Sequence, residues 1–187
     1  MPTIAPDELN GLVKRILIAA GADDANAGRV ADGLVLSDLS GVETHGVQQM
    51  PVYIKAIKEG DLVPTAKAEV VSETPTSALV RGHWTFGFVA ALRAVELAVE
   101  KAEKQGVAVA SMVEATHIGR VGEYSEIAAS RGMACLVWAS GYGVEEPYTV
   151  PYGGGKKVLH TDPISIGVPA GEEPAMVLDF ATTVVAG

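Results

Sequence analysis

The fold class is decided by residues 107–138, which read VAVASMVEATHIGRVGEYSEIAASRGMACLVW. The apolar start of this stretch predicts a strand over 107–113, residues 119–131 have the composition of a helix, and residues 133–138 predict a second strand. The order strand, loop, helix, strand is what a parallel crossover requires. We therefore predict an α/β fold with a parallel crossover between these two strands.

Residues 1–65 form the first of two predicted segments, and this segment is helical. Apolar side chains recur at helical spacing in its first helix, and Gly21 suits the left-handed stop that follows. Asp23 or Asp24 can cap a second helix, and a third helix ends at Gly60.

Residues 66–187 form the second predicted segment, an α/β cofactor-binding region that we expect to be incomplete. An apolar run directly before Gly187 ends the chain without a polar tail, and this leads us to expect a truncated chain. The other predicted elements of this segment are a hairpin or two short strands over 67–81 around a turn at 74–76, an Ala-rich helix over 87–105, and strands over 164–168 and 175–179.

Composition and charge argue against several classes of protein. The 187 residues include 14 Lys and Arg against 23 Asp and Glu, a formal net charge of −9, whereas nucleic-acid binding needs clustered cations. No apolar run approaches the roughly 20 residues of a membrane span, and no signal peptide is recognisable. Because the single cysteine, Cys135, cannot form an internal disulfide, we expect a cytoplasmic protein. The net charge and the lack of a long apolar run lead us to expect neither nucleic-acid nor membrane partners.

Common nucleotide and metal motifs are missing from the sequence. The glycines at 141 and 143 lack the third glycine of a dinucleotide fingerprint, and residues 153–156 lack the leading glycine and trailing hydroxyl residue of a phosphate loop. The sequence has no Cys pair and no His-x-x-x-His, so we predict no metal site.

His45 is the first candidate catalytic residue, and it lies in a polar loop, residues 38–46, that enters a helix. Imidazole changes charge near neutral pH, as a general acid or base must, and the Thr44 hydroxyl beside it can hydrogen-bond a ring or a substrate oxygen. The alternative interpretation is a loop histidine that bonds nearby backbone.

His117 is the second candidate, at the carboxyl end of a predicted parallel strand, where open α/β sheets bind ligands. The N–H groups that open the next helix favour an anion such as a cofactor phosphate, with Gly119 allowing close approach and Arg120 adding charge. The alternative is a helix start whose glycines serve packing.

Five motifs in this order resemble the malate/L-lactate dehydrogenase family of NAD(P)-dependent oxidoreductases, which includes ureidoglycolate and diketogulonate enzymes and is not Rossmann-folded. The resemblance implies a malate/L-lactate dehydrogenase-like α/β fold, with an N-terminal helical segment and a mixed sheet flanked by helices, and a homodimer. The motifs that carry it are residues 38–46 with Pro51 and Tyr53, Gly60 and Gly87 with the Ala-rich helix, 116–124, 151–154 with 161–163, and 178–187.

The same resemblance assigns site residues. It implies His45, Thr44 and His117 as catalytic residues beside one nicotinamide, and leaves open which imidazole transfers the proton. Gln49 is the substrate candidate; the family often has Arg there, and the guanidinium would clamp a carboxylate in bidentate fashion. The residues implied to contact NAD or NADP are His117, Ile118, Gly119, Arg120, Val121, Ser140, Asp179, Phe180 and Ala181.

The function predicted from the sequence is reversible hydride transfer between NAD(P)H and a small 2-oxo/2-hydroxy acid of the malate, lactate or ureidoglycolate kind. The alternative is a truncated or degenerate relative that acts only as a nucleotide-binding or interaction module. The abrupt end of the chain, Gln49 and Asp162 favour this alternative.

Overall fold

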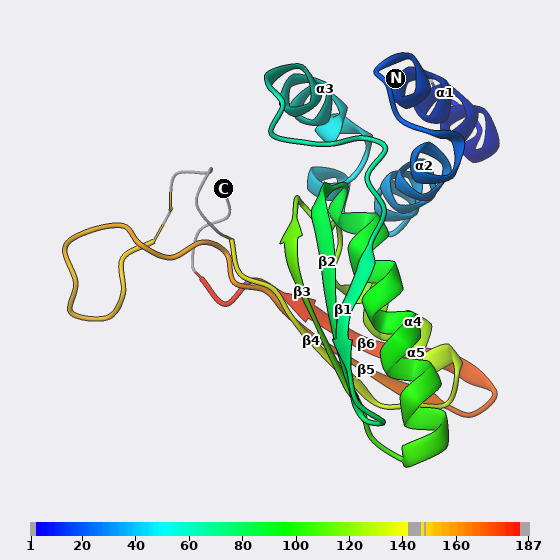
Figure 1. Ribbon diagram of the computed structural model, residues 1–187, viewed down its shortest axis with the longest axis vertical. Helices are drawn as coiled ribbons and strands as arrows, with labels where there is room; N and C mark the ends of the chain where they lie inside the picture. The colour runs from blue at the N-terminus through cyan, green and yellow to red at the C-terminus, as the bar shows by residue number, and fades with distance from the viewer. Residues whose placement is uncertain (1–2, 142–146, 148, 184–187) are drawn as a thin grey trace. The chain divides into compact units, whose positions relative to one another are not determined.

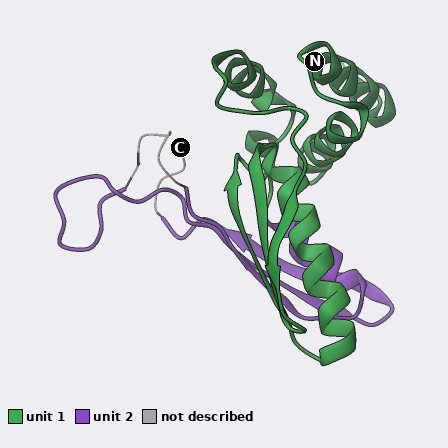
Figure 2. Ribbon diagram, viewed as in Figure 1, with its two compact units in different colours: residues 1–120 green, residues 121–187 purple. Residues whose placement is uncertain are grey.

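The computed structural model describes residues 3–141, 147 and 149–183. The chain divides into two compact units, residues 1–120 and residues 121–187, which are described separately (Figure 2). The boundary expected after residue 65 falls inside the first unit, where helices give way to strands. The apolar run at 184–186, which led us to expect truncation, lies outside the described residues.

Three α-helices open the first unit, as the sequence predicts (Figure 1). The Asp23 side chain accepts a hydrogen bond from the Asn26 N–H at 3.0 Å and caps the second helix. Gly60 ends the third helix with a φ of +85°, a conformation that favours glycine. The helices are α1 (Pro6–Ala19), α2 (Asp24–Leu39) and α3 (Met50–Glu59), with two short 3₁₀ turns, η1 (Glu43–His45) and η2 (Val47–Gln49), before α3.

A mixed three-stranded sheet completes the first unit. Strands β1 (Glu69–Glu73) and β2 (Ser77–Thr85) form the predicted hairpin, and β3 (Val109–Ala115) pairs with β2 in parallel. The connection between β2 and β3 is α4 (Gly87–Gln105), which packs on both strands. A parallel crossover therefore exists, but its helix is α4.

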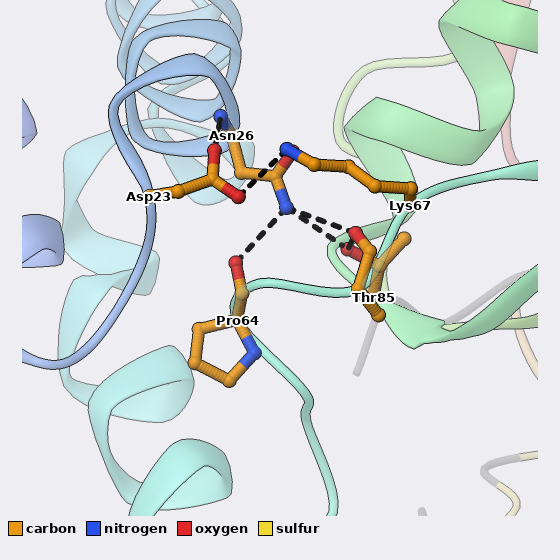
Figure 3. A network of polar contacts seen from close by, with 6 residues as sticks. Asp23, Asn26, Pro64, Lys67 and Thr85 are labelled. Carbon is orange, nitrogen blue, oxygen red and sulfur yellow. Dashed lines mark hydrogen bonds and ion pairs between the residues drawn. The ribbon is translucent and has the colours of Figure 1, made fainter.

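A buried amide ties α2 to the end of β2 (Figure 3). The Asn26 side chain donates to the Pro64 carbonyl at 2.9 Å and lies 3.5 Å from the Thr85 hydroxyl oxygen. Beside it, Lys67 pairs at 2.6 Å with the Asp23 carboxylate that caps α2. Because Thr85 directly precedes the turn into α4, this network fixes where the crossover helix begins.

The second unit is a three-stranded antiparallel sheet covered by one helix. Helix α5 (Gly122–Ser130) is followed by β4 (Cys135–Trp138), β5 (Ile164–Ala170) and β6 (Glu173–Phe180), in the order β4-β5-β6. The helix lies very close to β5 at Gly167. A Cβ added there would lie 2.5 Å from the Ser125 carbonyl oxygen. Glycine at this position is therefore required for the helix to pack on the sheet.

The predicted crossover between the strands at 107–113 and 133–138 is wrong. These strands are β3 and β4, and they belong to separate sheets: β3 pairs with β2, whereas β4 pairs antiparallel with β5. An apolar run identifies a strand but not its partner, because the partner is chosen by contacts between residues far apart in the chain. The α/β class itself is confirmed.

Two features are absent from the residues that the structure describes. Among the described helices, none is both long and apolar enough to span a bilayer. Within residues 3–141, 147 and 149–183, no three His, Cys, Asp or Glu side chains are grouped so that they could hold a metal ion.

Candidate active site

Two histidine rings lie together in the first unit. His45 ends the 3₁₀ turn η1 after α2, and His117 follows the end of β3. Their ring centroids are 5.2 Å apart and the ring planes are inclined by 40°. A single site that uses both imidazoles, as the sequence hypothesis requires, is therefore geometrically possible.

The loop that holds His45 is fixed by a carboxylate. Asp38, in the last turn of α2, accepts a hydrogen bond from the Val47 N–H at 3.0 Å. A Cβ at Gly46 would overlap the Asp38 carboxylate, so only glycine lets the carboxylate approach. Asp38 and Gly46, both in the motif at 38–46, thus set the position of the histidine between them.

Thr44 and Gln49 make further hydrogen-bond contacts in the turn that holds His45. The Thr44 hydroxyl oxygen is 2.9 Å from Nδ1 of His45. The Gln49 side chain donates to the Thr44 carbonyl at 2.6 Å and so closes the turn that presents the ring. Gln49, the substrate candidate, thus lies beside Thr44 and at the start of α3.

His117 is held through the residue before it. The Thr116 hydroxyl donates to the Thr85 carbonyl at 3.1 Å and accepts from the Gly87 N–H at 3.2 Å. A Cβ at Gly87 would overlap the backbone of Thr116 and His117, which explains the glycine at the start of α4. The network of Figure 3 therefore continues from Thr85 to the histidine.

A buried phenylalanine packs against the His117 ring. The Phe88 side chain is fully buried, and its ring meets His117 edge to face with centroids 6.4 Å apart. A Cβ at Gly119 would overlap this phenyl ring, and one at Gly33 of α2 would lie 2.5 Å from it. Gly119, whose φ is +74°, thus makes room for Phe88, which is the packing role that the sequence left open beside the approach of a ligand.

Tyr53 is a site residue to which the sequence analysis assigned no role. Its hydroxyl oxygen lies 2.7 Å from Nδ1 of His117, and the two ring centroids are 6.1 Å apart. The side chain points from α3 into the core and is only 3% exposed. The sequence signal that could have identified Tyr53 is a tyrosine at a core-facing helical position. A buried phenol needs a hydrogen-bond partner, which indicates a polar contact there.

The surroundings of His117 hold its imidazole in the neutral form. Burial, and secondarily the positive charge of the nearby His45, lower the pKa of His117 to about 4 from its ordinary value of 6.5. Both effects penalise the imidazolium, because a desolvated charge and a like charge nearby are unfavourable. At neutral pH this ring therefore carries one proton, on one of its two nitrogens.

The candidate cofactor residues are divided between the two units. The first unit contains His117, Ile118, Gly119 and Arg120, and the second contains Val121, Ser140, Asp179, Phe180 and Ala181. In the second unit, Trp138 pairs with Ile164 and Ile164 with Phe180. Because β4 and β6 both run antiparallel to β5, the residues that follow them leave the sheet at the same end, and Ser140 and the 180–181 segment lie at that end.

Two carboxylates organise that end of the second unit. Asp179 accepts from the Gly122 N–H at 2.7 Å and so caps α5. Ser140 donates to the Asp162 carboxylate at 2.7 Å, and the Thr182 hydroxyl donates to the Asp162 carbonyl at 2.9 Å. The first N–H of α5, suggested from the sequence as a phosphate contact, is thus bonded to a carboxylate.

Comparison with known proteins shows the family to which a chain with this fold belongs. The family model described as malate/L-lactate dehydrogenase matches residues 4–187, and the chain belongs to that family. The two histidines, the Asp38–Gly46 loop and the Thr116–Gly119 segment all lie within the matched range.

The relatives are dehydrogenases about twice as long as this chain. A malate dehydrogenase of Pyrococcus abyssi is 35% identical over 182 residues, which are 97% of this chain and 49% of the relative. An L-sulfolactate dehydrogenase of Methanothermobacter thermautotrophicus is 34% identical over 96% of this chain and 51% of its own length. The malate dehydrogenase structure from Pyrococcus horikoshii superposes with a TM-score of 0.91 at 33% identity, over 99% of this chain and 52% of that one.

Proposed function

We propose that this protein transfers a hydride between NAD or NADP and C2 of a small 2-oxo/2-hydroxy acid. The observation that carries the proposal is the pair of imidazoles 5.2 Å apart, in a chain of a family whose relatives include malate and L-sulfolactate dehydrogenases. Because the chain spans about half the length of these relatives, the activity of the whole protein is part of the proposal.

The proton of the reaction is assigned to the histidines. When C2 of a hydroxy acid loses a hydride, the proton of its hydroxyl group must pass to a base. His45 and His117 supply the imidazoles for this step, and Thr44 orients His45 through the contact of 2.9 Å at Nδ1. Gln49 lies beside Thr44, where its amide can bind the substrate carboxylate more weakly than a guanidinium would.

The donor set of the candidate residues suits a nicotinamide nucleotide, which supplies or accepts the hydride when bound. Arg120, three residues after His117 and only 8% exposed, offers a cation for the pyrophosphate. The hydroxyl of Ser140 and the carboxylate of Asp179 are the kinds of partner that ribose hydroxyls require. Because Asp179 already accepts from Gly122, we assign no phosphate to the start of α5.

A homodimer is proposed together with this activity. One face of the second sheet is apolar along paired positions: Leu136 faces Ile166 and Ile166 faces Leu178 in the register. Its outer strands expose Trp138 by 65% and Met176 by 68%. Contiguous exposed apolar side chains are typical of a surface covered by another chain.

The alternative function is a nucleotide-binding or interaction module without catalysis. Gln49 is the observation that favours it. The family often has Arg at this position, and glutamine lacks the guanidinium that would bind a substrate carboxylate. Nucleotide binding without turnover would support this alternative, whereas turnover would exclude it.

The test is a panel of 2-oxo acids with NADH and with NADPH, followed at the nicotinamide absorbance. We expect oxidation of one reduced nucleotide, and a fall in kcat/KM of about 10²-fold or more in His45→Gln and in His117→Gln. His83→Gln is the matched control, since His83 pairs with Glu69 outside this site. Normal rates in both site variants would refute the role of the histidines. Quenching of Trp fluorescence by nucleotide, with no turnover, would select the non-catalytic module.

A further inference from the structure

We propose that Tyr53 is a positioning residue that sets the tautomer of His117. Its hydroxyl donates to Nδ1, so that the single ring proton stays on Nε2 and His117 acts as a hydrogen-bond donor, while His45 carries the exchangeable proton. The tautomer is inferred from the contact and from the chemistry of its two partners, and its consequence for catalysis rests on the proposed function.

The contact between the two residues is short and rigidly supported. The oxygen–nitrogen distance of 2.7 Å is that of a strong hydrogen bond. The Tyr53 ring is buried and meets Phe86 edge to face with centroids 6.1 Å apart, so its hydroxyl has little freedom to move. Phe88 packs on the other partner, His117, in the same edge-to-face manner.

The direction of the hydrogen bond follows from the chemistry of its two partners. A neutral imidazole has one N–H and one nitrogen with a lone pair, and that second nitrogen is a strong acceptor. The phenol is the more acidic donor of the two, which favours O–H donation to Nδ1. In the reverse arrangement Nδ1 would donate, Nε2 would keep its lone pair, and His117 would be equipped as a base.

The surroundings of His117 keep its ring neutral at neutral pH, so that the ring has a single proton to place. Burial and the charge of His45 oppose a second proton on His117, so the neutral ring persists well below neutral pH. His45 has a different setting: it lies on the short turn η1 and has a threonine hydroxyl at Nδ1. Because His117 stays neutral, we assign the exchanged proton to His45.

The two histidines then have separate tasks in the reduction of a 2-oxo acid. The Nε2–H of His117 donates a hydrogen bond to the oxo oxygen and so polarises the carbonyl group. As C2 receives the hydride, this oxygen takes its proton from protonated His45, which is left neutral and regains a proton from water. The oxidation of a hydroxy acid follows the reverse course.

Nitrogen-15 NMR of the histidine rings tests the tautomer directly. Long-range proton–nitrogen correlations distinguish a protonated from an unprotonated ring nitrogen, and His117→Gln assigns the signal. In the wild-type chain at neutral pH we expect an unprotonated Nδ1 and a protonated Nε2 on His117. In Tyr53→Phe we expect both nitrogen shifts to move toward the average of the two tautomers. Tyr124→Phe removes an equally buried hydroxyl in the second unit and should leave the signal unchanged.

A protonated Nδ1 in the wild-type chain would overturn the proposal, even if Tyr53→Phe failed to fold. An unchanged tautomer in a folded Tyr53→Phe variant would overturn it as well. For catalysis, we expect Tyr53→Phe to lower kcat about tenfold, with the KM for the nucleotide unchanged. A chain that turns over no 2-oxo acid would instead contradict the proposed function, and would leave the NMR result to decide the tautomer.

Discussion

His45 and His117 have ring centroids 5.2 Å apart, although one follows α2 and the other follows β3. This spacing is close enough for the charge of one ring to oppose charge on the other, and that opposition contributes to the low pKa of His117. The same proximity lets two imidazoles reach one small substrate.

The stability of the chain should depend on pH through His117. Its pKa of about 4 in the folded state lies below the ordinary 6.5, so between these values the unfolded chain takes up a proton that the folded chain does not. From about pH 7.5 to about pH 5, this residue should lower the free energy of unfolding by about 2 kcal/mol. Urea unfolding at both pH values should show a smaller loss in His117→Gln than in the wild-type chain. An equal loss in both would contradict the low pKa.

Gly119→Ala should destabilise the first unit strongly. The new Cβ would overlap the Phe88 ring, and φ of +74° is unfavourable for alanine, so we expect a cost of about 3 kcal/mol in urea unfolding. Gly60→Ala is the matched control, because Gly60 also has positive φ but has no atom near its Cβ position. The control should cost about 1 kcal/mol. Equal costs would mean that Phe88 does not require the glycine.

Asn26→Leu should weaken the link between α2 and the end of β2. Leucine has a similar volume but cannot donate to the Pro64 carbonyl or contact the Thr85 hydroxyl, so buried acceptors lose their partner. We expect a loss of about 2–3 kcal/mol in thermal or urea unfolding. The same substitution at Asn10, which bonds Asp32 near the surface, should change stability by less than about 0.5 kcal/mol. A neutral Asn26→Leu would show that the network does not support the fold.

Gln49→Arg should strengthen binding of substrates that carry a carboxylate. The guanidinium can form a bidentate, charge-assisted pair with the carboxylate, and we expect the KM for a 2-oxo acid to fall about tenfold. Gln48→Arg adds the same charge at an exposed neighbour and should leave KM unchanged. If the two variants behave alike, position 49 does not contact the substrate carboxylate.

Much of the first unit could be predicted because its signals are local. Asp23 caps α2 through the N–H three residues later, and Gly60 ends α3 in the left-handed conformation, so each boundary depends on neighbours in the sequence. The hairpin around residues 74–76 is also local, because its two strands are adjacent in the chain. The strand pairing of residues 107–138 was predicted wrongly, because it depends on β2 and β5, which lie outside that stretch.

The sequence by itself determined the helix ends, the hairpin, the two histidine-bearing loops and, through the order of its motifs, the family. Only the tertiary structure decided that β3 pairs with β2, that Phe88 occupies the space beside Gly119, and that the Tyr53 hydroxyl meets Nδ1 of His117. The physical reason is the range of the interactions. Caps and turns form within a few residues, whereas sheet partners and buried contacts join segments that meet only when the core packs.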